Sequence, residues 1–115
     1  MMTPMTTEEL TLKYFHSWQV PTDLDELASC LRMDFKIDAG FFAFQDRAHF
    51  IQFLQINSTP WKDVVLLHSF YSEDYAAILY EGVNIETLQK FRVSEHLLIR
   101  EGLIAEVKTV IAALN

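Results

Sequence analysis

The stretch Phe91-Arg92-Val93-Ser94-Glu95-His96-Leu97-Leu98-Ile99 is followed by Arg100-Glu101-Gly102 and then by a second alternating run from Leu103 to Ile111. This pattern predicts two long strands joined by a tight turn. One face of the first strand is apolar apart from a single acid, Glu95. A carboxylate in an apolar row costs free energy unless it is paired, protonated or used. Glu95 is therefore the first candidate for chemistry.

Earlier segments show the same alternation. Asp63 to Tyr71 and Tyr75 to Asn84 are expected to form strands, joined by a turn at Ser72-Glu73-Asp74. Asp34 to Gly40 alternates over a shorter span and predicts a short strand. An aromatic-rich connection, Phe41 to Phe44, follows it.

Three segments before the long strands have helical periodicity. In the first, Thr6 and Glu9 have the spacing of a capping box, and Leu10, Tyr14 and Trp18 then recur on one helix face. This pattern predicts a first helix that begins after Thr6.

Two further helices follow from their capping residues. Thr22 is expected to cap a second helix with an apolar stripe at Leu24, Leu27, Ala28 and Leu31. Asp46 is expected to cap a third helix from Arg47 to about Ile56, which Asn57-Ser58-Thr59-Pro60 closes.

The order of these elements predicts the fold class. Because helices come first and long strands follow, we expect an α+β domain in which three helices pack on a strongly curved antiparallel sheet. No helix is expected between Val64 and Ser69. At 115 residues we expect one domain over residues 1–115, with residues 1–5 flexible.

Composition narrows the function classes. Half of the residues are hydrophobic, and sixteen acids against nine bases give a net charge of −7. No basic stripe is available for a phosphate backbone, so nucleic acid is not an expected partner. No apolar run approaches the ~18 residues that a spanning helix needs, and the start of the chain has no signal-peptide pattern. We therefore expect no membrane partner and a cytoplasmic location.

The cysteine and histidine residues do not form a metal-binding pattern. A lone Cys30 excludes an internal disulfide and a thiolate zinc site, and a small buried side chain is its expected role. His16, His49, His68 and His96 have no spacing typical of a metal site. We expect neither a metal nor a cofactor.

The whole pattern resembles the nuclear transport factor 2-like superfamily, in particular its SnoaL-like and ketosteroid isomerase-like branches. The resemblance spans roughly Thr6 to Ile111. It rests on a helical hairpin, a short strand ending in an acid, a third helix opening with Asp46-Arg47-Ala48, and the strand that runs into Glu101-Gly102-Leu103-Ile104. It implies a cone-shaped fold, which hosts isomerases, cyclases, dehydratases, epoxide hydrolases and members without catalysis.

The resemblance implies roles for three residues. Tyr14 falls where isomerase-like members place a phenol that donates to a substrate oxygen, and Asp38 falls where they place the base that moves a proton. Glu95 falls where they place a second, protonated acid, although they use Asp. Epoxide-hydrolase members pair an Arg with an Asp on this strand, and Val93 stands in place of that Arg, which disfavours this reaction.

The residues themselves leave alternatives open. Tyr14 is either a cavity phenol or a core aromatic whose hydroxyl reaches solvent. Asp38 lies on the Lys36 face of its strand, so it is either a base or a solvated acid before a turn. Glu95 is either a ligand-facing acid or a structural carboxylate tied to Tyr14, His68 or a backbone donor.

Two functions from different classes follow. The first is a small enzyme that performs acid–base chemistry on a hydrophobic molecule in the cone, with Asp38, Glu95 and Tyr14 as catalytic residues. The second is a non-catalytic dimeric module that binds a small apolar ligand or supports assembly. The residues expected to line the ligand site are Trp18, His68, Phe91, Val93 and Leu97.

Apolar residues on the far face of the sheet predict an assembly. We expect Leu67, Leu98, Val107 and Ile111 to lie on strand faces that three helices do not all cover. A homodimer through the sheet is the expected cover, since superfamily members often pair in this way.

Overall fold

Six strands form one sheet in the computed structural model, which describes residues 5–57 and 59–115. The elements in chain order are α1 (Thr7–Ser17), α2 (Leu24–Ser29), β1 (Leu31–Asp38), β2 (Ala43–Phe44), α3 (Arg47–Ile56), β3 (Trp61–Tyr71), β4 (Tyr75–Asn84), β5 (Lys90–Arg100) and β6 (Leu103–Ala113). The order of strands across the sheet is β2-β1-β6-β5-β4-β3. This is an α+β fold, as the sequence predicts.

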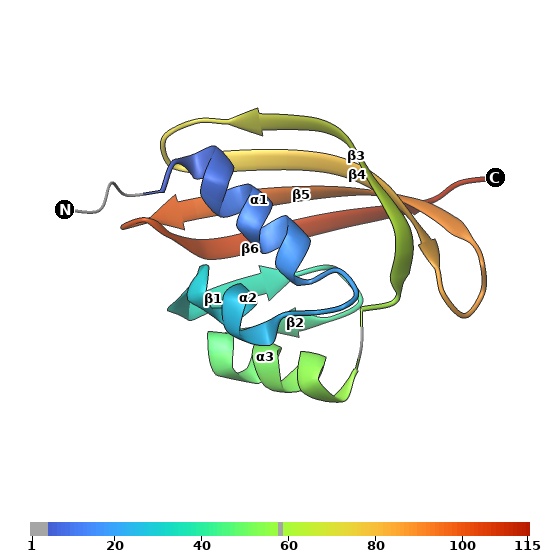
Figure 1. The fold of residues 1–115 in the computed structure, drawn as a ribbon, viewed down its shortest axis with the longest axis horizontal. Coiled ribbons are helices and arrows are strands. Elements are labelled where there is room, and N and C mark those ends of the chain that lie inside the picture. The colour runs from blue at the N-terminus through green and yellow to red at the C-terminus, as the bar shows by residue number, and fades with distance from the viewer. Residues whose placement is uncertain (1–4, 58) are drawn as a thin grey trace.

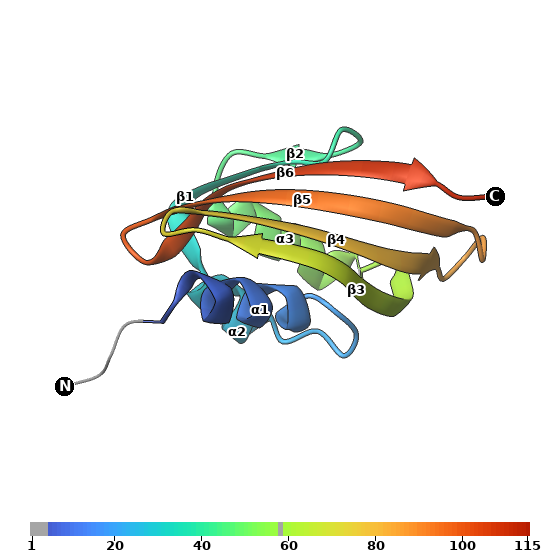
Figure 2. The same ribbon diagram turned by 90° about the horizontal axis from the view of Figure 1, so that it is seen from above.

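The helices lie on one face of a curved sheet, with α1 crossing in front of the long strands and α3 below β1 and β2 (Figures 1 and 2). All neighbouring strands are antiparallel except β1 and β6, which run parallel. The expectation of an antiparallel sheet is wrong for this one pair. Parallel strands are joined by a long connection and not by a hairpin turn, so no turn motif in the sequence predicts their pairing.

Irregularities in the strand pairing accompany the curvature. The register shifts twice along β3, between Lys62 and Val65 and between Leu66 and His68. A third shift lies between Leu98 and Ile99 of β5. Each extra residue bends its strand and increases the local twist. The long strands therefore curve around the helices, and the expectation of strand from Val64 to Ser69 is confirmed.

The helix boundaries follow their caps. The capping box of Thr6 and Glu9 is present, and the Asp46 side chain accepts from the backbone of α3. The expected cap of α2 is wrong by one residue, since the side chain of Asp23, and not Thr22, accepts from the helix backbone. Leu31 is also not helical, because β1 begins there and pairs with Ile104.

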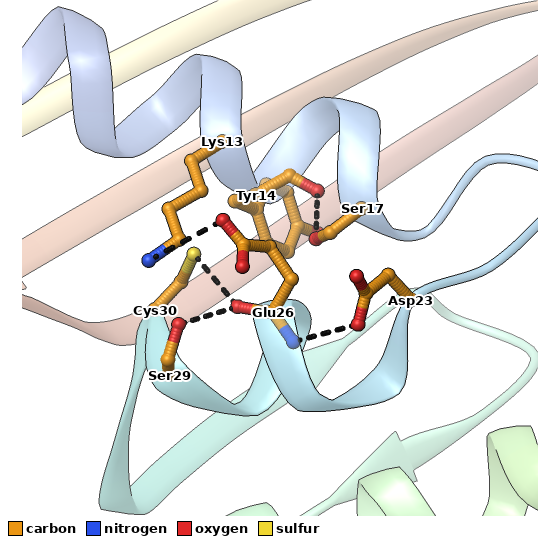
Figure 3. A network of polar contacts seen from close by, with 7 residues as sticks. All are labelled: Lys13, Tyr14, Ser17, Asp23, Glu26, Ser29 and Cys30. Atoms are coloured by element: carbon orange, nitrogen blue, oxygen red, sulfur yellow. Dashed lines mark hydrogen bonds and ion pairs between the residues drawn. The ribbon is translucent and has the colours of Figure 1, made fainter.

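An ion pair joins α1, the helix that carries Tyr14, to α2. In Figure 3, Lys13 of α1 reaches toward Glu26 of α2, with its Nζ 3.6 Å from Oε1. The backbone carbonyl of Glu26 accepts from the hydroxyl of Ser29 and the thiol of Cys30. Cys30 is fully buried, as expected for a small side chain in the core. The Lys13–Glu26 ion pair therefore joins the two helices, whereas the two bonds to the Glu26 carbonyl lie within α2 and at its end.

Two expectations fall partly outside the described residues. Residues 1–4, which were expected to be flexible, and Ser58, in the expected closing turn of the third helix, lie outside them. In the part of the chain that the structure does describe, no helix combines the length and apolar character needed to cross a membrane.

Candidate functional site

Glu95 lies at the centre of a buried hydrogen-bonded cluster. Its side chain is 4% exposed. Oε2 accepts from the hydroxyl of Tyr14 at 3.0 Å and from that of Thr109 at 3.1 Å. Oε1 accepts from the hydroxyl of Tyr80 at 3.2 Å. The carboxylate thus receives three hydroxyl donors, which is how a buried charge avoids the full cost of leaving water.

Three elements bring these donors to one place. Glu95 of β5 stands directly opposite Thr109 of β6 in the strand register. Tyr80 of β4 stands opposite Val93, one inward position along β5. Tyr14 comes from α1, which covers this face of the sheet, and is separated from Glu95 by 81 positions in the chain. The cluster therefore forms only when the helix docks on the curved sheet.

A largely apolar cavity of about 280 Å³ adjoins the cluster. The lining residues come from both helices and strands and are Tyr14, Trp18, Ile37, Ala39, Phe41, Phe42, Phe50, Phe53, Leu54, Thr59, Pro60, Trp61, Tyr80, Val93, Glu95, Thr109 and Ile111. Glu95 is the one charged side chain among them. The cavity therefore has an aromatic body and a single polar region.

Burial dominates the acid–base behaviour of the cluster. Desolvation raises the pKa of Glu95, and the hydrogen bonds from Tyr14, Thr109 and Tyr80 oppose that shift. Burial, followed by the nearby Glu95 charge, raises the pKa of Tyr14 and of Tyr80 well above that of an ordinary phenol. The two phenols thus keep their protons, while Glu95 is the group that titrates.

The raised pKa of Glu95 predicts a pH-dependent stability difference between the native protein and a Glu95→Gln variant. A raised carboxyl contributes stability that is complete below its ordinary pKa of 4.5 and is lost as the pH rises through the folded-state pKa. The native protein should therefore lose stability relative to the variant on going from pH 4.5 to neutrality. Urea unfolding of both proteins at a series of pH values measures this difference.

Surface acids do not obscure this measurement. Asp34, Asp46 and Glu81 have lowered pKa values because they accept hydrogen bonds from Arg32, from the backbone and ring of His49, and from Arg92 respectively. Their contributions are lost at low pH in both proteins and cancel in the difference. A stability difference that does not change with pH would mean that Glu95 titrates normally in the fold.

Four of the sequence-predicted site residues line the cavity together. They are Tyr14, Trp18, Val93 and Glu95. Of the structural alternatives for Glu95, a tie to Tyr14 is present. The hydroxyl of Tyr14 is buried in this bond and does not reach solvent.

The structure places Asp38 away from this cluster. Its side chain is exposed on the other face of the sheet and accepts from the backbone N–H of Gly40 at 2.9 Å. In the register, Asp38 stands beside Lys108 of β6, whereas its neighbour Ile37 faces the cavity. This agrees with the position on the Lys36 face that alternation predicts. The structure does not bring Asp38 and Glu95 to one site.

His68 also lies on the outer face, contrary to the expected position beside Glu95. Leu66 stands opposite Tyr80, but the register shift after Leu66 places His68 opposite Leu79. Residues directly opposite one another share a face, so one extra residue turns His68 outward. Its side chain is exposed.

Phe91 and Leu97 face inward without lining the cavity. The ring of Phe91 packs edge to face on Trp61, with centroids 5.2 Å apart. Leu97 is fully buried in the core, opposite Val107. Phe91 thus supports the lining residue Trp61, and Leu97 belongs to the hydrophobic core on the inner face of the sheet.

Sequence reasoning missed two donors to Glu95 and most of the aromatic lining. Tyr80 shares a strand face with Ala76 and Ile78, and Thr109 shares one with Val107 and Ile111, so the sequence pattern indicates that both point inward. Their proximity to Glu95 depends on strand register, which alternation alone does not give. Phe41 and Phe42 reach the cavity through the fold of the loop that contains them.

Trp18 contributes a second polar feature. Its side chain is 6% exposed, and its indole Nε1 has no acceptor among the described residues. Its backbone carbonyl accepts from the hydroxyl of Thr59 at 2.7 Å. This contact joins the end of α1 to the segment before β3, so the two sides of the cavity are held together.

The histidines lie apart. His16 and His68 are exposed, His49 contacts the Asp46 carboxylate, and His96 bonds to Tyr75 and Ser94 on the outer face. Within residues 5–57 and 59–115, no group of three or more His, Cys, Asp and Glu side chains is arranged to hold a metal ion.

Comparisons with known proteins find likeness in structure. No protein-family model matches the sequence, and curated proteins give no significant match. An NTF2-like protein of unknown function from Cytophaga hutchinsonii is similar with a TM-score of 0.81, 14% identity, and coverage of 97% of this chain and 95% of its own. A candidate ketosteroid isomerase from Kribbella flavida is similar with a TM-score of 0.81 and 18% identity over 95% of this chain and 79% of its own.

A candidate polyketide cyclase from Sinorhizobium meliloti is similar with a TM-score of 0.72 and 16% identity over 87% of this chain and 92% of its own. At these identities the likeness shows the fold, and the activities in those names belong to those proteins. The curved sheet, the helices on its concave face and these matches agree with the resemblance in the sequence. The chain has the fold of the nuclear transport factor 2-like superfamily.

Proposed function

We propose that this protein binds a small hydrophobic molecule in the cone cavity, with Glu95 recognising its polar group. The observation that carries the proposal is a buried carboxylate at the edge of an apolar cavity of about 280 Å³. Cavities with mostly apolar walls and a few convergent polar groups are the usual form of small-molecule sites. The solved structures of similar fold include candidate isomerases and cyclases, which is consistent with a site for such molecules.

A purely structural role explains this arrangement less well. A buried carboxylate needs compensating donors, and an apolar residue of similar size would fill the core at lower cost. Here four hydroxyl and carboxyl groups from different elements converge beside an open volume. Such convergence beside empty space is what a ligand site requires.

Binding of cyclooctanol tests the proposal. The two tryptophans of the chain, Trp18 and Trp61, both line the cavity, so their emission reports entry of a ligand that does not itself absorb. We expect a saturable change in tryptophan emission as cyclooctanol is added. Cyclooctane, added as cyclooctane-saturated buffer, competes with cyclooctanol for the cavity, because the two molecules share the same apolar ring. Absence of a saturable signal, together with absence of binding by calorimetry, would remove the ligand site.

Acid–base catalysis at the same site is a second candidate, favoured by the raised pKa of Glu95. The carboxylate would take a proton from carbon next to a carbonyl, the electron pair would move to the carbonyl oxygen, and the proton would be returned. Incubation of cyclooctanone in heavy water tests this step, because exchange of the protons next to its carbonyl is visible by NMR. Exchange that Glu95→Gln does not slow excludes Glu95 as the base.

We also propose a homodimer through the outer face of the sheet. Large apolar side chains are exposed there, namely Val65, Phe70, Leu98 and Val110. Two residues expected on this face, Val107 and Ile111, instead face inward, Val107 in the core and Ile111 in the cavity lining. An isologous pairing would cover the apolar patch.

Val110→Lys is expected to convert the dimer to a monomer, because Val110 is 64% exposed within the patch and a lysine buried there would be unpaired. Light scattering at micromolar concentration measures the mass, which should fall from about twice 13.4 kDa to that of one chain. Ile56→Lys is the control, since Ile56 is exposed on α3, on the other side of the sheet. A native protein that is monomeric at this concentration refutes the proposal.

We propose a cytoplasmic location, and the buried free thiol of Cys30 is compatible with a reducing compartment. Fractionation of cells that express the tagged chain tests it.

A further inference from the structure

The hydroxyl groups at the polar end of the cavity already donate their hydrogen bonds to other groups of the protein. Tyr14, Tyr80 and Thr109 donate to the Glu95 carboxylate, and the hydroxyl of Thr59 donates to the Trp18 carbonyl. Each hydroxyl has one proton. With Glu95 ionised, the hydroxyl and carboxyl groups of the described lining residues present lone pairs and no free O–H donor. This polar end is therefore arranged to accept hydrogen bonds.

Among residues 5–57 and 59–115, no side chain of the cavity lining is a counterion for Glu95. The described lining residues include no Lys, Arg or His, and the described ion pairs do not include Glu95. The remaining side-chain donors of the lining are the two indoles, which are neutral. A carboxylate with three neutral donors and no cation has room for a positive group, since a paired buried charge is far less costly than an unpaired one.

The walls of the cavity suit the same kind of group. The lining includes Trp18, Phe50 and Trp61 besides the two phenols. The faces of aromatic rings attract cations, most strongly where water is excluded. An apolar body would also fit, because the wall is otherwise carbon.

We propose that the preferred ligand is a hydrophobic amine, whose protonated nitrogen donates hydrogen bonds to Glu95 while its apolar body lies among the aromatic rings. This inference rests on the cavity being a ligand site, as proposed for the function. It reverses the polarity that the family resemblance implies, in which the acid and the phenol donate to a substrate oxygen. The reason is the direction of the three hydrogen bonds, since Glu95 is the acceptor in all of them.

Three probes with one ring test the proposal. Cyclooctylamine carries a cationic donor, cyclooctanol a neutral donor and cyclooctanone an acceptor alone. Tryptophan emission gives the affinity of each at neutral pH. We expect the amine to bind at least about tenfold more tightly than the ketone, with the alcohol between them, because hydrogen bonds to charged groups are the stronger ones. An equal or tighter affinity for the ketone overturns the inference.

Glu95→Gln isolates the contribution of the charge. In this variant we expect the affinity for the amine to fall to that of the alcohol, while the affinity for the alcohol changes little. If the amine keeps its advantage in the variant, the charge of Glu95 is not what it recognises. Circular dichroism establishes that the variant folds.

A pH series on the native protein serves in place of the variant if the variant does not fold. The advantage of the amine should shrink as the pH falls and Glu95 takes up a proton. The other titratable groups that face Glu95 are Tyr14 and Tyr80, whose pKa values lie well above the working range. An advantage that is constant across the series contradicts the inference.

The outcomes separate the two proposals. If alcohol and ketone bind and the amine binds no better, the ligand site stands and the amine preference fails. If none of the three probes binds, both proposals fail.

Discussion

Replacing Val93 by phenylalanine is expected to weaken the binding of cyclooctanol by at least about a hundredfold, a loss of roughly 2.7 kcal/mol of binding free energy. Val93 is 1% exposed and lines the cavity next to Glu95 on β5. The larger ring has the empty volume of about 280 Å³ to enter, where it would occupy the place of the ligand. Tryptophan emission and calorimetry measure the loss.

A matched substitution on the outer face controls for general effects. Val65 is 56% exposed on β3, so Val65→Phe adds the same ring without reaching the cavity, and binding should be unchanged. Overpacking a core costs about 1–3 kcal/mol, so Val93→Phe also reduces the stability of the protein. Ile111→Phe provides a second blocking variant at a less buried position, because Ile111 lines the cavity from the half-buried end of β6. Native affinity in both folded blocking variants would show that the probe binds elsewhere.

Replacing Phe35 by alanine is expected to reduce the free energy of unfolding by about 3–5 kcal/mol, the usual cost of removing a buried ring and leaving a cavity. Phe35 lies in β1, is fully buried, and packs on Phe50 with ring centroids 5.4 Å apart. Since Phe50 lines the ligand cavity, the loss should also loosen the site. Urea unfolding measures the change.

Met33 provides the control on the same strand. Its side chain is 76% exposed, so Met33→Ala should change the free energy of unfolding by less than about 0.5 kcal/mol, as is usual for surface positions. A similar loss for both variants would mean that the face of β1 that carries Phe35 is not packed against α3.

Local patterns were sufficient for most of the secondary structure. The bounds of β4 and α3 are confirmed, and the turn of β5 into β6 has positive φ at Glu101 and Gly102, as a tight hairpin requires. The caps at Thr6 and Asp46 are confirmed for the same reason, since a cap depends on neighbours within one turn. Alternation also placed Glu95 on the buried face.

Local sequence patterns did not predict which strands pair with one another across the sheet. Two of the three phenylalanines in the Phe41 to Phe44 connection, Phe41 and Phe42, reach the cavity because β2 folds back on β1. The parallel pairing of β1 with β6 joins segments far apart in the chain, and no residue type specifies it. Long-range pairing is decided by the packing of the whole core.

The positions of Glu95, Tyr14 and Trp18 on apolar faces follow from the sequence, because the periods of strands and helices are local properties of the chain. Tertiary packing decided that Tyr80 and Thr109 join Tyr14 in donating to Glu95. It also decided that His68 turns away, because one bulged residue reverses every later side chain of a strand. The strand register and the docking of the helices depend on the summed energy of many weak contacts, and these contacts form only when the sheet has curved around its helices.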